Sequence, residues 1–176
     1  LERGWIGQIL DVDIHLNLHT PWEQFPFLKN LERVEILVHS VHYLDWIRSI
    51  LGEPQGVYAR TVGHPQFPEL GSTRTSAILD YGDTVRCSLS INHNFAFGPN
   101  HQVAAIRIEG DRGAAVVKLG LLLNYPEGEP DELEIITKGT SWQPVAVRGG
   151  WFPDAFIGTM SNLQRFADGE DENTLK

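Results

Sequence analysis

Three ionisable side chains stand close together in the stretch His39-Ser40-Val41-His42-Tyr43-Leu44-Asp45. Two residues separate His39 from His42, and two separate His42 from Asp45, so each pair can meet on the surface of a helix. An imidazole that hydrogen-bonds a carboxylate has a fixed tautomer and suits proton transfer near neutral pH. The spacing indicates either a proton-relay or substrate-binding site, or a purely structural hydrogen bond between His42 and Asp45.

The two histidines also admit a third interpretation, a metal site built from His39, His42 and another histidine. The spacing H-x-x-H is loose, and no cysteine pair or H-E-x-x-H sequence supports it. We therefore expect no metal ligands among the site residues. His93 follows a predicted strand, where binding groups are common, and is a candidate substrate contact beside His39.

A helix from about Asn30 to Leu51 is predicted to position the His42 and Asp45 side chains. Gly52 suits the left-handed position after its last turn, and Pro54 prevents continuation. At about 100° per residue, a polar strip lies beside an apolar stripe that should face the core. The polar strip consists of Glu35, His39, His42, Asp45, Trp46 and Ser49. The apolar stripe consists of Val34, Leu37, Val41, Leu44 and Leu51.

Most of the remaining chain alternates between apolar and polar residues, which is typical of strands with one buried face. A strand at 12–19 precedes an irregular loop at 20–27, and a last helix spans 153–167. Turn residues at 81–83 and 110–113 predict hairpins, and 126–131 is a polar loop. Further strands are predicted at 57–62, 72–81, 84–92, 103–109, 114–119, 133–137 and 144–147.

One major helix, many antiparallel strands and a final helix predict an α+β fold. We expect an open, mostly antiparallel sheet with helices packed on one face. Val, Ile and Leu are scattered so evenly that the second face should not be wholly polar. Burial of that face against another copy would form a homo-oligomer.

The composition is that of one globular domain spanning residues 1–176. Fourteen basic residues against 23 acidic ones give a net charge of −9, which argues against nucleic acid and membrane surfaces as partners. No secretory signal is evident, and the single Cys87 fits a buried, inert thiol in a reducing cytoplasm. The sequence lacks G-x-G-x-x-G and other phosphate-binding motifs, so this chain should not bind NAD by itself.

The order of these features resembles the Gfo/Idh/MocA family, which includes glucose-fructose oxidoreductase and inositol dehydrogenase. The most specific part is His42-Tyr43-Leu44-Asp45 followed by Gly52-Glu53-Pro54, which is similar to the family pattern G-x-H-x-x-D-x-x-x-x-x-x-G-x-P. The hairpin Ile108-Glu109-Gly110-Asp111-Arg112-Gly113 and the segment Trp151-Phe152-Pro153 also look familiar. The likeness runs loosely from about Gly4 to Gly169.

The resemblance implies the C-terminal, substrate-side and dimerisation domain of an NAD(P)-dependent oxidoreductase that acts on a sugar, polyol or related hydroxy compound. The N-terminal Rossmann domain, which would hold most of the cofactor, lies outside these residues. His42 matches the family histidine that handles the hydroxyl proton, and Asp45 the acid one turn later. His39 and His93 are then expected to contact the small-molecule substrate.

One position departs from the family pattern. Many members carry an Asp four residues before the histidine, where this chain has Val38. A hydrophobic side chain there cannot hydrogen-bond a substrate hydroxyl. Either His39 supplies the polar group, or this branch of the family uses different chemistry. Val38 also favours a rival interpretation, a non-catalytic dimerisation module that keeps the fold.

Overall fold

Strict alternation in Val12-Asp13-Ile14-His15-Leu16 produces the central strand, β1 (Ile9–Asn17). Val12, Ile14 and Leu16 are buried on one face of this strand, and His15 is exposed on the other, because successive strand side chains point to opposite faces. Strand β1 lies near the middle of the sheet. The structure is a computed structural model, which describes residues 4–123 and 128–170.

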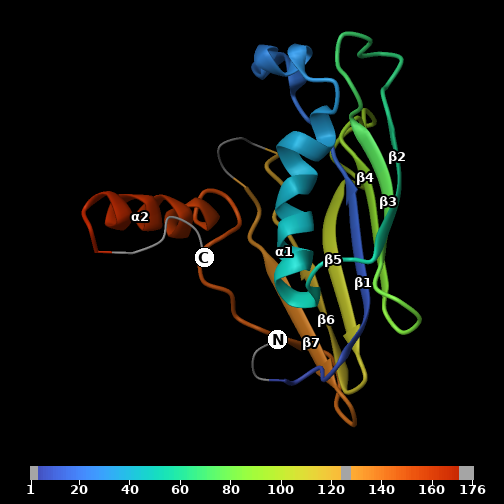
Figure 1. The fold of residues 1–176 in the computed structure, drawn as a ribbon, viewed down its shortest axis with the longest axis vertical. Coiled ribbons are helices and arrows are strands. Elements are labelled where there is room, and N and C mark those ends of the chain that lie inside the picture. Colours follow the sequence, from blue (N-terminus) through green and yellow to red (C-terminus); the bar gives the residue numbers. More distant parts are fainter. Residues whose placement is uncertain (1–3, 124–127, 171–176) are drawn as a thin grey trace.

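The sheet contains eight strands in the order β2-β3-β4-β1-β5-β6-β7-β8 (Figure 1). β1 pairs with β4 in parallel, and every other pairing is antiparallel. An open, mostly antiparallel α+β sheet is therefore confirmed, as are the hairpins β3–β4 and β5–β6. The other strands are β2 (Gly56–Val62), β3 (Arg74–Asp80), β4 (Arg86–Asn92), β5 (Val103–Gly110), β6 (Gly113–Lys118), β7 (Glu132–Thr137) and β8 (Gln143–Pro144).

The segment between β1 and β2 is less regular than the single helix predicted for it. A π turn, η3 (Ile36–Ser40), leads into the α-helix α1 (Val41–Leu51), which ends at Gly52 as expected. Gly52 has a positive φ of 78°, but its ψ of −160° lies outside the left-handed helical region. Two 3₁₀ helices, η1 (Trp22–Gln24) and η2 (Pro26–Asn30), occupy most of the predicted loop and the start of the predicted helix. Helix α1 lies across one face of the sheet (Figure 1).

The predicted apolar stripe was correct at Val34, Leu44 and Leu51, which face the core, and wrong at Leu37 and Val41. Leu37 and Val41 are 59% and 45% exposed, whereas Tyr43 and Ile47 are buried against the sheet. The cause is the π turn, in which the Val41 N–H donates to the Ile36 carbonyl five residues earlier. A turn of this width holds more residues than an α-helical turn, so a wheel drawn at α-helical spacing loses register across it.

The main core lies between α1 and the covered face of the sheet. Leu89 and Cys87 of β4 pack there with the β1 side chains and Ile47, and Cys87 is a buried free thiol, as expected. A smaller cluster of Trp22, Leu28, Val34 and Leu70 lies beside η3.

The last helix, α2 (Ala155–Ala167), matches the predicted position but not the predicted packing. None of its residues is buried, and it projects away from the sheet (Figure 1). Its apolar residues Phe156, Met160, Leu163 and Phe166 are all exposed. In the part of the chain that the structure describes, no helix combines the length and the hydrophobicity that a membrane crossing requires.

The second face of the sheet carries no helix of the described residues. Tyr58 and Ile78, which pair across β2 and β3, are 69% and 56% exposed on it. That face is therefore not wholly polar, as the sequence suggested. The predicted loop at 126–131 falls partly on residues 124–127, which lie outside the described residues.

Candidate functional site

Three strand ends converge beneath the start of the helical segment. The Thr20 N–H, just beyond β1, donates to the His93 carbonyl at 3.2 Å, and the His93 N–H donates to the Thr73 carbonyl at 3.3 Å. The Glu35 N–H donates to the Ser72 carbonyl at 2.9 Å. These bonds fix the backbone of His93 and Glu35 against the same end of the sheet.

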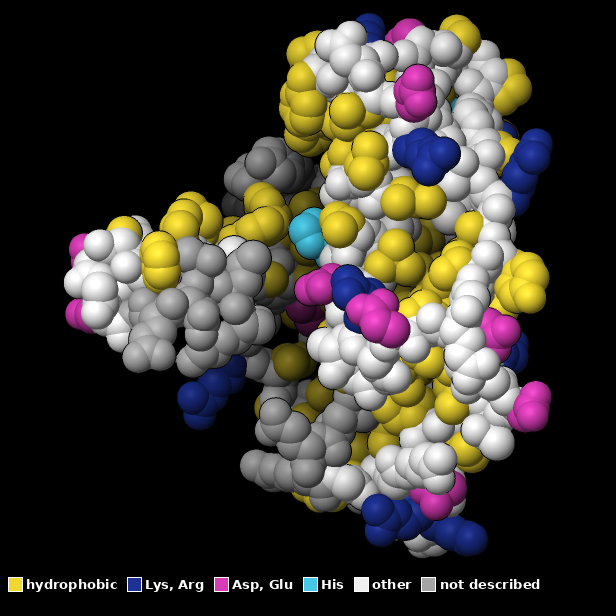
Figure 2. Space-filling model, in the orientation of Figure 1, with side chains coloured by type: hydrophobic (Ala, Val, Ile, Leu, Met, Phe, Trp, Pro, Cys, Tyr) yellow, Lys and Arg dark blue, Asp and Glu magenta, His cyan; other side chains and the backbone are white. Residues whose placement is uncertain are grey.

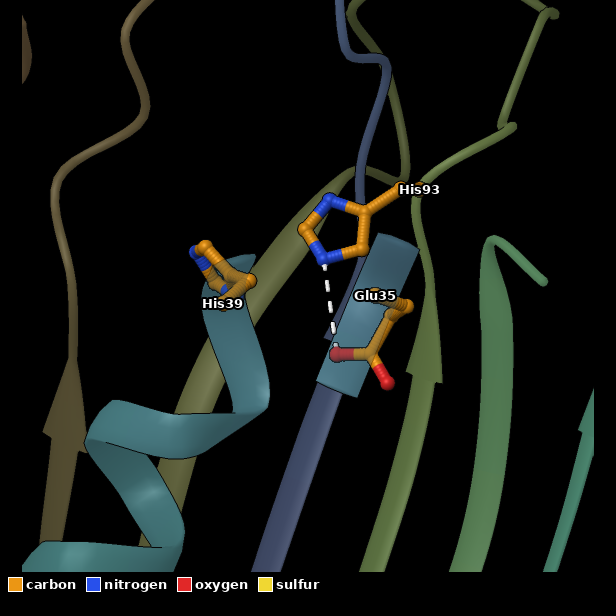
Figure 3. Close-up of side chains that lie close together, drawn as sticks. All are labelled: Glu35, His39 and His93. Carbon is orange, nitrogen blue, oxygen red and sulfur yellow. Dashed lines mark ion pairs between the residues drawn. The ribbon is translucent and has the colours of Figure 1, made fainter. Parts of the chain in front are cut away.

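Glu35, His39 and His93 meet at this place (Figure 3). The rings of His39 and His93 lie edge to face with centroids 4.5 Å apart. His93 Nε2 is 3.9 Å from Glu35 Oε1, the separation marked by the dashed line in Figure 3. One donor atom of each residue lies within 4.8 Å of the other two. We call these three residues the triad.

Two hydroxyl groups orient the triad from outside. Ser40 Oγ donates to Glu35 Oε1 at 2.5 Å, and Thr20 Oγ1 lies 3.0 Å from His93 Nδ1. Within the triad itself, three polar atoms are buried without a hydrogen-bond partner among the described residues: Glu35 Oε2, His39 Nδ1 and His93 Nε2. Such atoms are uncommon in folded proteins, because each costs free energy to remove from water.

Burial sets the electrostatics of the triad. Glu35 and His93 are only 1% and 4% exposed, and His39 is half-buried. Burial raises the pKa of the Glu35 carboxyl, against the opposing effect of the Ser40 and Thr75 hydroxyl groups. Burial lowers the pKa of His93 to about 3 with a contribution from His39, and that of His39 to about 4 with a contribution from His42. Both imidazoles are therefore neutral at pH 7 and can act as ligands or acceptors.

His42 and Asp45 are exposed on α1, on the part of the helix that does not contact the sheet. The side-chain hydrogen bonds of this helix within the described residues join Arg48 to Glu53 and Ser49 to the Trp46 carbonyl, and none joins His42 to Asp45. The pair therefore faces outward, where a neighbouring domain or a substrate could reach it.

An apolar surface surrounds this exposed pair. Leu37, Val38 and Val41 are 59%, 39% and 45% exposed at the start of α1. Figure 2 shows hydrophobic side chains at the surface there and along α2. An exposed apolar patch next to polar groups is typical of an interaction or ligand site.

The structure thus separates the predicted residues into two groups. His39 and His93 are brought together, while His42 and Asp45 lie on the outer surface of α1. The buried partner, Glu35, was placed on the same strip as His39 by the wheel but was not given a role. The spacing E-x-x-x-H between Glu35 and His39 was the available signal, since residues four apart share a helical face.

Comparison with known proteins identifies the family. Residues 1–116 match the family model for the GFO/IDH/MocA C-terminal domain. The chain belongs to the GFO/IDH/MocA family. The resemblance drawn from the sequence is therefore confirmed. No curated protein sequence matches the chain significantly.

Solved structures share this fold at low sequence identity. An oxidoreductase from Agrobacterium radiobacter, in complex with NAD+, L-tartaric acid and magnesium, is 19% identical with a TM-score of 0.68 over 98% of this chain and 51% of its own. The WlbA dehydrogenase from Bordetella pertussis, with NADH and UDP-GlcNAcA, is 18% identical with a TM-score of 0.62 over 97% and 48%. An inositol dehydrogenase homologue from Azotobacter vinelandii, with NADH and myo-inositol, is 13% identical with a TM-score of 0.61 over 89% and 40%. The chain spans about half the length of these GFO/IDH/MocA-like structures or less.

Proposed function

We propose that this GFO/IDH/MocA domain is the substrate-side part of an NAD(P)-dependent oxidoreductase whose N-terminal Rossmann domain holds most of the cofactor. Structures of the same fold contain NAD+ or NADH and are about twice as long. The described residues fit a covering role, because the surface around His42 is apolar and exposed at Leu37, Val38 and Val41. When bound in the other domain, NAD(P) exchanges a hydride with the substrate carbon.

The substrate class that we propose is a small molecule with a secondary hydroxyl group, such as a sugar, a polyol or a hydroxy acid. Tartaric acid, myo-inositol and a UDP-linked sugar acid occupy structures of this fold. All three carry such hydroxyls, which supports oxidation of an alcohol carbon to a carbonyl as the proposed chemistry.

The observation that carries the proposal is the outward position of His42 on α1, one helical turn before Asp45. As the alcohol carbon becomes a carbonyl, a His42 ring nitrogen takes the hydroxyl proton, and it returns that proton in the reverse direction. The Asp45 carboxylate lies close enough along the helix to orient the ring and to stabilise its protonated form. His39 and His93 are proposed to contact the substrate from beneath.

The test is His42→Gln in the full-length protein that includes the Rossmann domain. Loss of a proton-transfer group typically costs about 10²–10⁴ in rate. We therefore expect kcat to fall by that factor in steady-state assays with NAD(P) and a panel of polyols and hydroxy acids. His101→Asn is the matched control, because His101 is exposed in a loop and Asn tolerates its positive φ of 68°. An unchanged kcat for His42→Gln would remove His42 from the mechanism.

A second candidate function is a non-catalytic dimerisation module of the same fold. Val38 favours it, because a hydrophobic side chain stands where many relatives carry an acid. Substrate-dependent turnover of NADH by the full-length protein would exclude this candidate. Its absence across the panel, with NADH still bound, would support it.

We further propose that the protein assembles through the exposed face of the sheet and works in the cytoplasm. Tyr58 and Ile78 support the first point, because large apolar side chains on an open sheet face are typical of interfaces. The buried free thiol of Cys87 supports the second.

A further inference from the structure

The triad combines the residue types of a transition-metal site. Two histidines and one glutamate form a known set of zinc ligands that leaves a fourth position open. The metal site considered from the sequence used His39 and His42, but the structure pairs His39 with Glu35 and His93 instead. Glu35 and His39 come from one helical segment, whereas His93 follows β4 more than fifty residues later, so no single sequence motif contains the whole set.

The separations between the ligand atoms of the triad are slightly longer than those around a bound zinc ion. Ligand bonds of about 2.1 Å in a tetrahedral zinc site separate the ligand atoms by roughly 3.4 Å. In the triad, His93 Nε2 and Glu35 Oε1 are 3.9 Å apart, and all three donor atoms lie within 4.8 Å of one another. Side-chain rotations that shorten these separations by up to about 1.4 Å would complete the geometry.

The unpartnered atoms of the triad point to a missing cation. His39 Nδ1 and His93 Nε2 are buried without hydrogen-bond partners among the described residues, and His93 Nε2 faces Glu35 Oε1. Each can present a lone pair, and 3.9 Å is too long for a direct hydrogen bond between His93 and Glu35. A divalent cation would satisfy these lone pairs and compensate the buried carboxylate charge.

The surroundings also resemble the outer shell of a metal site. A ligating histidine usually hydrogen-bonds through its other ring nitrogen, and here Thr20 Oγ1 lies 3.0 Å from His93 Nδ1. Ser40 holds the carboxylate of Glu35, and the Trp22 ring covers His93 at a centroid distance of 5.9 Å. His39 belongs to a π turn, an element often found at functional sites.

We propose that Glu35, His39 and His93 bind one divalent transition-metal ion of the zinc type. The ion would occupy the buried end of the sheet and keep one coordination position open toward the half-buried side of His39. His39 and His93 would then meet a substrate only through the ion. The site depends neither on the cofactor nor on the role proposed for His42.

The experiment measures binding of Zn²⁺ and Co²⁺ alone, with no cofactor or substrate present. The untagged protein is stripped with chelator and titrated with Co²⁺, whose visible absorption reports tetrahedral coordination, and Zn²⁺ affinity is measured by competition with a chelating dye. We expect one ion per chain and a tetrahedral Co²⁺ spectrum. Absence of stoichiometric binding would overturn the proposal, whatever the enzyme's activity.

The variants identify the ligands. Glu35→Gln and His93→Gln should raise the Kd for Zn²⁺ by more than the 10–100-fold typical of losing an outer-shell partner, and Thr20→Val should fall within about that range. His42→Gln and His101→Asn should bind as tightly as the wild type. Loss of binding in His42→Gln alone would assign the ion to the helix surface and overturn the site. Should the ligand variants fail to fold, the proposal is still tested by the Co²⁺ spectrum of the wild type and by the Zn²⁺ affinity of Thr20→Val.

Discussion

At the scale of single residues, the chain buries polar groups where an ordinary core would be apolar. Glu35 and His93 are almost inaccessible, and each retains a polar atom without a partner in the described structure. Arrangements of this kind cost stability and are found mainly where chemistry or binding requires them. The exposed His42 carries no such cost, because its side chain stays in contact with water. Burial therefore affects His39 and His93 but not His42.

The buried His93 predicts how stability depends on pH. The pKa of His93 is about 3 in the native state, compared with an ordinary value of 6.5. Below about pH 6.5 the His93 ring is therefore protonated in the unfolded chain but still neutral in the native protein. Its contribution to stability is therefore complete above pH 6.5 and is lost as the pH falls toward 3. Glu35 acts in the opposite direction, because its pKa is raised in the native state.

The measurement compares chelator-treated wild type with His93→Gln by urea denaturation between pH 7 and pH 4.5. The difference in unfolding free energy between the two proteins should change by up to about 1.4 kcal/mol per pH unit below pH 6.5. The wild type should lose the larger amount. The effect of Glu35 is present in both proteins and largely cancels. Parallel pH profiles would show that His93 titrates normally in the native state.

At the scale of elements, the π turn η3 decides which helical residues reach the sheet. It lies directly before α1, and the residues on either side of it follow different phases. Val34 and Glu35 are buried before the turn, and Tyr43 and Ile47 after it, with exposed Leu37 and Val41 between. The turn therefore carries His39 inward while it leaves His42 outside.

The register of α1 is tested by a matched pair of truncations. Ile47→Ala removes a side chain that is 0% exposed in the main core and should lower the free energy of unfolding by about 2–5 kcal/mol. Leu37→Ala removes a side chain that is 59% exposed, and it should change the free energy of unfolding by less than about 0.5 kcal/mol in this chain. Equal effects in chemical denaturation would mean that the α-helical wheel, and not the π turn, describes the segment.

At the scale of the whole molecule, two surfaces stay open within the described chain. One is the sheet face that bears Tyr58 and Ile78, and the other combines the start of α1 with the projecting helix α2. An isolated domain rarely exposes several large apolar groups together without a partner. We assign the first surface to a second copy and the second to the cofactor domain, in line with the proposed function.

The assembly is tested by Tyr58→Arg combined with Ile78→Arg. Both side chains are exposed, so the fold should be retained, but copies meeting on this face would bring like charges together. Such contacts cost several kcal/mol, so the Kd of self-association should rise at least about 100-fold in analytical ultracentrifugation. Phe97→Arg, at a side chain 87% exposed in a loop, is the control. An unchanged Kd in the double variant would exclude this face as the interface.

Local alternation was enough to predict most of the sheet. Apolar residues at every second position produced β1 and β4, and Gly-containing turns produced the hairpins, because a strand's side-chain period and a tight turn's backbone are local properties. The order and spacing of several motifs, of which His42 to Pro54 is the most specific, were likewise enough to identify the family, because they depend on residue order rather than on packing.

Only the tertiary structure decided that Glu35, His39 and His93 meet. His93 is more than fifty residues from the other two along the chain, and it reaches them because β1 and β4 run in parallel and end at the same edge. The inward position of His39 depends on a π turn. The hydrogen bond of that turn cannot be predicted from the spacing of apolar residues in the sequence. Sequence spacing describes neighbours on one element, whereas a buried site is formed where separate elements are packed together.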